Sequence, residues 1–172
     1  MNNESLRDKK SIVIYFSRAD ENYSVGYIEK GNTEVVAEYI KEITNADLFK
    51  VERKTPYAKD YQTCIEEAQE ELNKNERPEL VNYLDNIDDY EVIYIGQPVW
   101  WSYPPMPMYT QLEKLNWNGK IVMPFTTHEG SGLGSCVSAI QKICVGADVK
   151  DGLAIRGSSV KESKNRIEEW IK

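Results

Sequence analysis

The sequence predicts an α/β fold in which a five-stranded parallel sheet is covered by helices on both faces. Three short runs, 11–17, 91–96 and 119–127, are apolar with little alternation, which is typical of strands buried on both faces. Segments with helical periodicity separate the strands, and this alternation implies right-handed crossovers and a parallel sheet. The 172 residues suit a single domain, 1–172, in which 1–10 are expected to form a flexible N-terminal segment.

The individual elements follow from local patterns. Segment 32–43 carries its apolar side chains on one helical stripe, and 47–52 alternates like a strand. Residues 59–75 are rich in Glu, Ala, Gln and Lys, so they predict an exposed helix that ends near Arg77-Pro78. The expected strands are 11–17, 47–52, 91–96, 119–127 and 151–157, and the expected helices are 32–43, 59–75, 109–115, about 133–144 and 160–171.

Composition excludes several classes of partner. The net charge of −7 argues against nucleic acid and against an anionic membrane surface, which both need a basic footprint. The first apolar run, 12–16, is too short for a signal peptide, and no stretch has the length of a membrane helix, so we expect a cytoplasmic protein. The odd cysteine count without a C-x-x-C pair indicates reduced thiols rather than disulfides or a zinc site. Cys136 and Cys144 are eight residues apart in one expected helix, so both are expected to face the protein core.

The loop after the first strand has the composition of a phosphate site. In doubly wound sheets, ligands bind beyond the carboxyl ends of the strands, so the loops after the first, third and fourth strands should meet. The first loop begins at Ser17-Arg18 and ends at Gly31-Asn32-Thr33, just before a helix whose N-terminus offers unpaired N–H groups. The alternative is that Asn32 or Thr33 only caps the helix. A Walker loop is excluded because its Gly-Lys-Ser/Thr sequence is absent.

The loop after the third strand, PVWWSYPP (98–105), places large aromatic rings among prolines. Prolines stiffen the loop and hold the rings at low entropic cost, so a flat aromatic ligand could stack on Trp100 or Tyr103. The alternative is that Trp101 is buried in the core and Trp100 belongs to a protein interface.

The loop after the fourth strand, TTHEGSGLG (126–134), is rich in backbone N–H groups. It lacks the last glycine of G-x-G-x-x-G, because Ser135 stands there, and it is not a G-x-S-x-G nucleophile elbow. Its N–H groups could bond the polar edge of a heterocycle. Together the three loops imply a ligand with one phosphate and one flat ring, and FMN fits this better than a dinucleotide.

At this point the chain resembles the flavodoxin family. The resemblance is carried by YFSR (15–18), GNTEVVA (31–37), RPEL (77–80), IGQPVWWSYPPMPM (95–108) and GKIVMPFTTHEGSGLGS (119–135). It covers nearly the whole chain, and its strength lies in the ordered set, since each motif alone is weak.

The resemblance implies a three-layer fold with strand order 2-1-3-4-5 and non-covalently bound FMN. It also implies a role for each matching residue. Ser17, Arg18, Asn32 and Thr33 would hold the phosphate, Pro98, Val99, Trp100 and Trp101 would flank the flavin, and Thr126, Thr127, His128, Gly130 and Gly132 would bound its other edge.

One insertion departs from the common pattern. Twelve residues, ADENYSVGYIEK (19–30), split the phosphate loop where a short turn is usual, so the resemblance is weakest at Arg18 and Ala19. The insertion carries Tyr23 and Tyr27 and could lie over the flavin or bind a partner, or it could be an exposed Ω-like loop.

Two functions compete on this fold. One is a low-potential electron carrier that needs no catalytic acid or base, takes electrons from a reductase protein and passes them to an acceptor protein, as a monomer or weak homodimer. The other is an NAD(P)H-dependent flavin or quinone reductase. A flavin-free binding module is a third, minor alternative. His128, the only histidine, could transfer a proton to the flavin, or it could only hydrogen-bond backbone.

Overall fold

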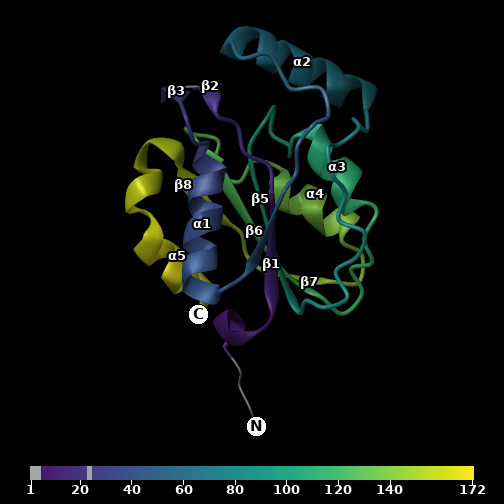
Figure 1. Cartoon of the computed structure of the whole chain (residues 1–172), viewed down its shortest axis with the longest axis vertical. Helices are drawn as coiled ribbons and strands as arrows, with labels where there is room; N and C mark the ends of the chain where they lie inside the picture. Colours follow the sequence, from purple (N-terminus) through teal and green to yellow (C-terminus); the bar gives the residue numbers. More distant parts are fainter. Residues whose placement is uncertain (1–4, 23–24) are drawn as a thin grey trace.

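The structure is a computed structural model that describes residues 5–22 and 25–172, and its centre is a parallel sheet (Figure 1). The predicted α/β fold is confirmed. The sheet order is β4-β1-β5-β6-β7, with β8 paired to β6, so the predicted order 2-1-3-4-5 holds while the fifth position is shared by two short strands. The strands are β1 (Ser11–Tyr15), β4 (Asp47–Lys50), β5 (Val92–Pro98), β6 (Ile121–His128), β7 (Asp148–Val149) and β8 (Leu153–Arg156).

A proline explains why the fifth position is divided. In β6, Val122 accepts a hydrogen bond from Lys150 N–H, so its backbone groups face the β7 side of the sheet. Backbone direction alternates along a strand, so Pro124 faces the same side and has no N–H to donate there. The pairing with β7 ends at Val122–Val149 and resumes with β8 at Phe125–Leu153, on either side of this proline.

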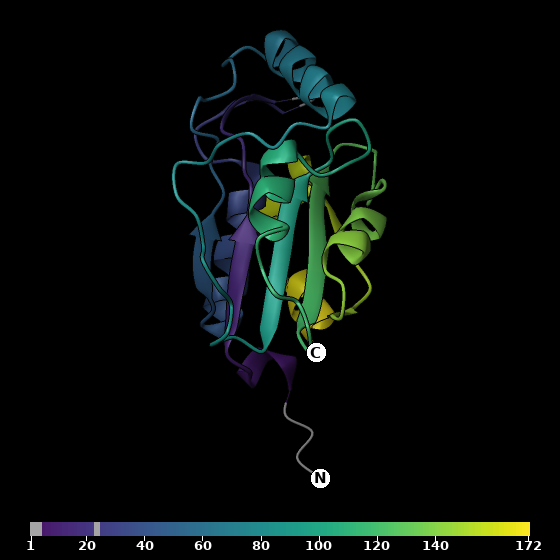
Figure 2. The ribbon, with the colours of Figure 1, turned by 90° about the vertical axis from the view of Figure 1, so that its right-hand side faces the viewer.

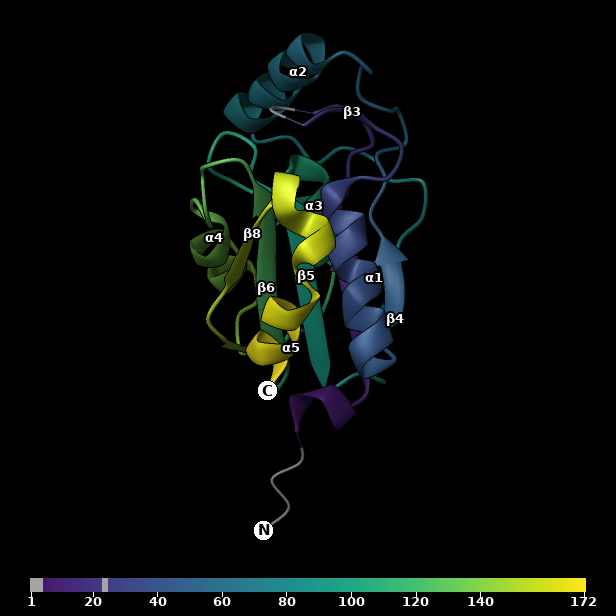
Figure 3. The ribbon, with the colours of Figure 1, turned by 90° about the vertical axis from the view of Figure 1, so that its left-hand side faces the viewer.

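Helices cover both faces of the sheet, as predicted. One face carries α1 (Asn32–Thr44) and α5 (Lys164–Ile171), and the other carries α3 (Met106–Leu112) and α4 (Cys136–Ile143) (Figures 2 and 3). All five residues of β1 are buried, because each of its faces packs against helices. The loops that follow β1, β5 and β6 therefore emerge at one end of the molecule.

Helix α2 (Tyr61–Lys74) belongs to neither face and lies across the carboxyl ends of the strands (Figures 1 and 2). The Asp60 carboxylate caps it by accepting the Thr63 N–H at 2.9 Å. The helix was expected at 59–75, close to its observed bounds. Its mostly charged surface is exposed, and its buried residues are Cys64, Ala68 and Glu71.

Three boundaries differ from the sequence prediction. Helix α3 begins at Met106 rather than 109, because Pro105 is the N-cap and Pro107 lies in the first turn, where a missing N–H costs nothing. The helix expected at 133–144 is the shorter α4 (Cys136–Ile143). The segment expected as one helix at 160–171 begins with a 3₁₀ helix, η2 (Gly157–Glu162), before α5.

The insertion between Arg18 and Gly31 is a hairpin, not the Ω-like loop. Strands β2 (Asp20–Asn22) and β3 (Gly26–Ile28) pair antiparallel. Tyr27 is 70% exposed, and Tyr23 lies outside the described residues.

Residues 5–10 of the expected N-terminal segment contain a short 3₁₀ helix, η1 (Leu6–Asp8), and Leu6 packs against the core beneath α1 and α5. Cys136 and Cys144 are buried, as predicted, and the cysteines are free. Within the described ranges, no helix combines the length and apolar character needed to cross a bilayer.

Candidate functional site

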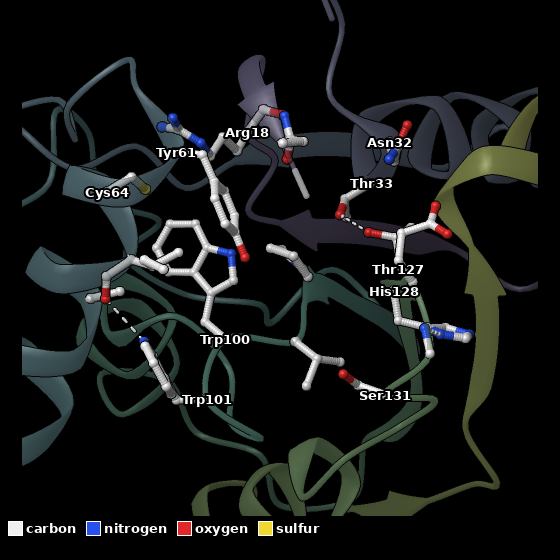
Figure 4. A pocket seen from close by; sticks show the side chains of 17 residues that line it. Arg18, Asn32, Thr33, Tyr61, Cys64, Trp100, Trp101, Thr127, His128 and Ser131 are labelled. Carbon is white, nitrogen blue, oxygen red and sulfur yellow. Dashed lines mark hydrogen bonds between the residues drawn. The ribbon is translucent and has the colours of Figure 1, made fainter. Parts of the chain in front are cut away.

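A cavity of about 430 Å³ lies where the three predicted loops meet, at the carboxyl edge of the sheet (Figure 4). Helix α2 forms one wall of the cavity, with Tyr61, Cys64, Ile65 and Ala68 among the lining residues. Of the residues predicted for the site, it brings together Arg18, Asn32, Thr33, Pro98, Val99, Trp100, Trp101, Thr127, His128 and Gly130.

The phosphate loop is split in sequence but closed in space. Ser17 Oγ accepts the N–H of Glu34 at 2.9 Å, so a residue from the far side of the hairpin caps the first turn of α1. A Cβ on Gly31 would approach Ser17 Oγ to 2.1 Å and Arg18 O to 2.7 Å, so this approach requires glycine. Because Ser17 is the acceptor in this bond, its O–H hydrogen remains available to donate.

Asn32 and Thr33 border the cavity at the start of α1, where the helix N–H groups and dipole favour an anion. Neither residue is the helix cap; Gly31 holds that position, and the side-chain acceptor for the first turn comes from Ser17. The Thr33 and Thr127 hydroxyls lie 2.8 Å apart and are both buried, which joins the loop after β1 to the loop after β6 (Figure 4).

Arg18 borders the cavity, but its guanidinium also reaches α2. Its Nη2 donates to the carbonyl oxygen of Lys59 at 2.8 Å, immediately before the helix begins. The side chain therefore ties the loop after β1 to the segment that leads into α2.

Trp100 forms the aromatic wall of the cavity, from the opposite side to Thr33, Thr127 and His128 (Figure 4). Its indole meets Phe16 and Tyr57 edge-on, with both ring centroids 5.1 Å away. The alternative that Trp101 is buried in the core is wrong, because this residue is 44% exposed and its Nε1–H donates to Ile65 O of α2 at 3.0 Å.

The turn that carries these rings is strained. Trp100 and Tyr103 exchange both backbone hydrogen bonds, which forces the left-handed region on Trp101 (φ 52°) and Ser102 (φ 73°). The turn is held by Ser135, whose N–H donates to Ser102 O at 2.6 Å. Strain of this kind persists where surrounding contacts over-determine the backbone, often at a ligand site.

The loop after β6 is shaped by its own hydrogen bonds. Thr126 Oγ1 donates to Gly132 O at 2.9 Å, and Gly130 and Gly132 have φ of 131° and 61°. His128 Nδ1 accepts the Gly130 N–H at 2.9 Å, so the neutral ring carries its proton on Nε2. Burial and the nearby Arg156 guanidinium lower the pKa of His128, which keeps the ring neutral near pH 7.

Four predicted residues do not line the cavity: Ser17, Tyr103, Thr126 and Gly132. Ser17, Thr126 and Gly132 shape the loops, as described above. Tyr103 faces away, is 40% exposed, and borders a second hollow between α3 and α4.

Sequence reasoning missed the contribution of α2, of Asn22 in the hairpin, and of two residues in the loop after β6. The missed lining residues are Asn22, Tyr61, Cys64, Ile65, Ala68, Glu129 and Ser131. The sequence signal for α2 was a stripe of less polar residues at helical spacing, Tyr61, Cys64, Ile65 and Ala68, in an otherwise charged helix. Tyr61 and Trp100 both line the cavity, and Figure 4 draws them on the side opposite Thr127 and His128.

Glu129 is a buried carboxylate at the cavity edge, with only 8% of its side chain exposed. Its Oε1 accepts the Ser158 N–H, and its Oε2 lies 3.5 Å from Arg156 Nη1. A Cβ placed on Gly157 would meet both the Asn32 amide nitrogen (2.3 Å) and Glu129 Oε1 (3.0 Å), so the carboxylate lies close to the candidate phosphate site.

These features fit a ligand with an anionic group and a flat ring. The start of α1 suits a phosphate, Trp100 offers a flat apolar wall, and the loop after β6 offers polar groups at the opposite edge.

Comparison with known proteins agrees with this geometry. A family model described as Flavodoxin matches residues 10–172. A solved flavoprotein structure from Bacteroides eggerthii is 26% identical, with a TM-score of 0.71 and coverage of 94% of this chain and 99% of that chain. A flavoprotein in complex with FMN from Lactobacillus acidophilus NCFM is also 26% identical, with a TM-score of 0.64 and coverage of 95% and 99%.

A flavoprotein structure from Bacteroides uniformis, 24% identical with a TM-score of 0.74 and coverage of 94% and 99%, shares the fold. No curated protein matches the chain.

Proposed function

Because the chain belongs to the flavodoxin family, we propose that it binds one FMN non-covalently in this cavity and works as a low-potential electron carrier. The observation that carries the proposal is the cavity itself, which combines a helix N-terminus at one end with an aromatic wall at the other. The L. acidophilus relative, described as a complex with FMN, supports the choice of cofactor.

The chain's own residues would bind and orient the cofactor, and FMN would supply the redox chemistry. The first N–H groups of α1, with Asn32 and Thr33, would hold the phosphate, while Ser17 fixes the first turn of that helix from outside the cavity. Trp100 would cover the flat ring, and His128 Nε2–H with the N–H groups near Gly130 would face its polar edge.

Two features of the chain support a low reduction potential. An indole wall favours the oxidised, flat form of the flavin. The net charge of −7 disfavours additional negative charge on a reduced flavin. A two-electron potential above that of free FMN would contradict this part of the proposal.

The partners we propose are a reductase protein and an acceptor protein in the cytoplasm, with the chain acting as a monomer or weak homodimer. The neutral His128 ring, already bonded to Gly130, supports a carrier over an enzyme that needs a side-chain acid. The three reduced, buried cysteines suit a reducing compartment.

The test is anaerobic reduction of the FMN-loaded protein with NADPH or NADH, followed by its visible spectrum, with free FMN as control. We expect the yellow spectrum to persist until a separate reductase is added. Rapid bleaching by the nucleotide alone would overturn the carrier proposal in favour of an NAD(P)H-dependent reductase. Failure to take up FMN at all would indicate a flavin-free binding module.

A further inference from the structure

Beneath α2 lies a buried ionic cluster that the proposed function does not use: Arg53, Tyr57 and Glu71. Glu71 and Tyr57 are 5% and 9% exposed. The Tyr57 hydroxyl donates to Glu71 Oε1, and Arg53 Nη1 lies 3.3 Å from the same oxygen. A carboxylate is rarely buried unless charged or polar partners satisfy it, so these contacts hold the three side chains in one arrangement.

The cluster is also fixed from both sides. Arg53 Nη2 lies 3.8 Å from Glu67, and Glu67 Oε1 accepts the Ala58 N–H at 2.8 Å. The backbone of Arg53 pairs with that of Leu80. Tyr57 is therefore tied to α2 through its hydroxyl on Glu71, and the next residue, Ala58, is tied to the same helix through its N–H on Glu67.

The ring of Tyr57 connects this cluster to the wall of the cavity. The Arg53 guanidinium lies over the Tyr57 ring, 4.1 Å from its centroid. The same ring meets Trp100 edge-on at 5.1 Å and 81°, and Phe16 at 6.1 Å. Trp100 borders the cavity, whereas Tyr57 is not among the described residues that line it.

We propose that Tyr57 is a positioning residue: anchored by Glu71 and Arg53, it holds the Trp100 indole against the flavin and thereby lowers the flavin's reduction potential. The inference rests on the proposed function, since it requires a flavin beside Trp100. The backbone of Trp100 is fixed by its two bonds with Tyr103, whereas its ring packs against Phe16 and Tyr57, so these side chains set the ring orientation. A loosened indole stabilises the oxidised flavin less.

The test compares Tyr57→Leu with Tyr94→Leu. Both substitutions remove a buried tyrosine ring, but Tyr94 lies on the opposite face of the sheet, beside Trp170. Three properties are measured for each: affinity for oxidised FMN, two-electron potential, and visible circular dichroism of the bound flavin.

For Tyr57→Leu we expect an affinity for oxidised FMN about tenfold weaker with the reduced form little changed, which corresponds to a potential about 30 mV higher. The visible circular dichroism of the bound flavin should change together with the potential. For Tyr94→Leu we expect loss of stability only, with wild-type potential and dichroism.

Tyr57→Phe and Glu71→Gln preserve volume and keep the test decisive if Tyr57→Leu does not fold. Both remove part of the anchor of Tyr57, so both should raise the reduction potential, by less than Tyr57→Leu does. Wild-type potential and dichroism in these variants would overturn the inference, as would equal shifts in Tyr94→Leu. A wild-type protein that binds no FMN would instead refute the proposed function.

Discussion

At the scale of single residues, the site places a buried carboxylate beside the proposed phosphate position. Phosphate sites at helix N-termini usually gather donors and positive charge. Glu129 opposes this, because within residues 5–22 and 25–172 its one ion pair is with the exposed Arg156 side chain, at 3.5 Å. Its structural role is to cap η2 through Ser158.

Replacing Glu129 with Gln should therefore strengthen FMN binding. The amide keeps the shape and can still accept the Ser158 N–H, while the repulsion of the phosphate is removed. We expect a gain on the order of 1 kcal/mol, roughly fivefold in Kd, for a charge pair in this partly screened setting. Titration with riboflavin, which lacks the phosphate, is the control and should show no gain. Equal gains for both ligands would contradict a charge effect on the phosphate.

His128 should make stability depend on pH. Its native pKa lies below the ordinary value of 6.5, so the unfolded chain binds a proton more readily than the native chain. The contribution of neutral His128 to the free energy of unfolding is complete above the pKa of the unfolded chain. This contribution decreases as the pH falls towards the native pKa. His128→Gln should remove this part of the decline between about pH 7 and 5, as measured by urea unfolding relative to wild type.

The same variant tests the role of His128 in proton transfer. With Nδ1 bonded to Gly130, we expect the pH profile of flavin reduction to stay unchanged in His128→Gln. A shifted profile would show that the ring transfers a proton.

At the scale of elements, α2 is held over the cavity by two hydrogen bonds from the cavity loops in addition to the contacts of Arg53, Tyr57 and Ala58 with Glu67 and Glu71. Trp101 Nε1–H bonds Ile65 O of this helix, and Arg18 bonds Lys59 O just before it. Trp101→Phe keeps most of the ring and removes the first bond, which is worth about 1 kcal/mol. We expect amide exchange in α2 to accelerate roughly fivefold, with β1 and β5 unaffected.

Trp170→Phe is the matched control. Its indole N–H bonds Asp151 O at 3.0 Å, far from α2, so it should leave exchange in that helix unchanged. Equal acceleration in both variants would mean that Trp101 does not hold α2.

The strained turn gives a second prediction at this scale. Ser102 is exposed and adopts φ 73°, a conformation that costs about 1 kcal/mol for a non-glycine residue. Ser102→Gly should raise the free energy of unfolding by up to that amount in urea titrations. Ser138→Gly, on the exposed surface of α4, should instead destabilise by about 0.5 kcal/mol. Loss of stability in Ser102→Gly would show that the turn is not strained.

At the scale of the whole molecule, the charge of −7 should govern encounters with partners. With a basic electron acceptor such as cytochrome c as probe, we expect the rate of electron transfer from the reduced protein to fall steeply as NaCl rises from 10 to 300 mM. A neutral acceptor such as a soluble quinone is the control and should show little dependence. A flat rate with the basic acceptor would argue against electrostatic steering.

The sequence pattern determined the alternation of strands and helices and the three loops, and the resemblance to flavodoxins added the strand order. Buried parallel strands carry unbroken apolar runs, and their loops must meet at one edge, so Asn32, Trp100 and His128 could be placed together before any coordinates. Pro124 was also a sequence signal for the replacement of the last expected strand by β7 and β8, since proline lacks the N–H that continuous pairing needs.

Tertiary structure alone decided the rest. Ser17 and Glu34 are 17 positions apart, and only the folding of the insertion into a hairpin brings them together. The position of α2 over the cavity involves long-range bonds from Arg18 and Trp101, and the edge-on contact of Tyr57 with Trp100 joins two loops that are distant in the sequence. Local periodicity reports which face of an element is apolar, but it carries no information about which distant segment that face will meet.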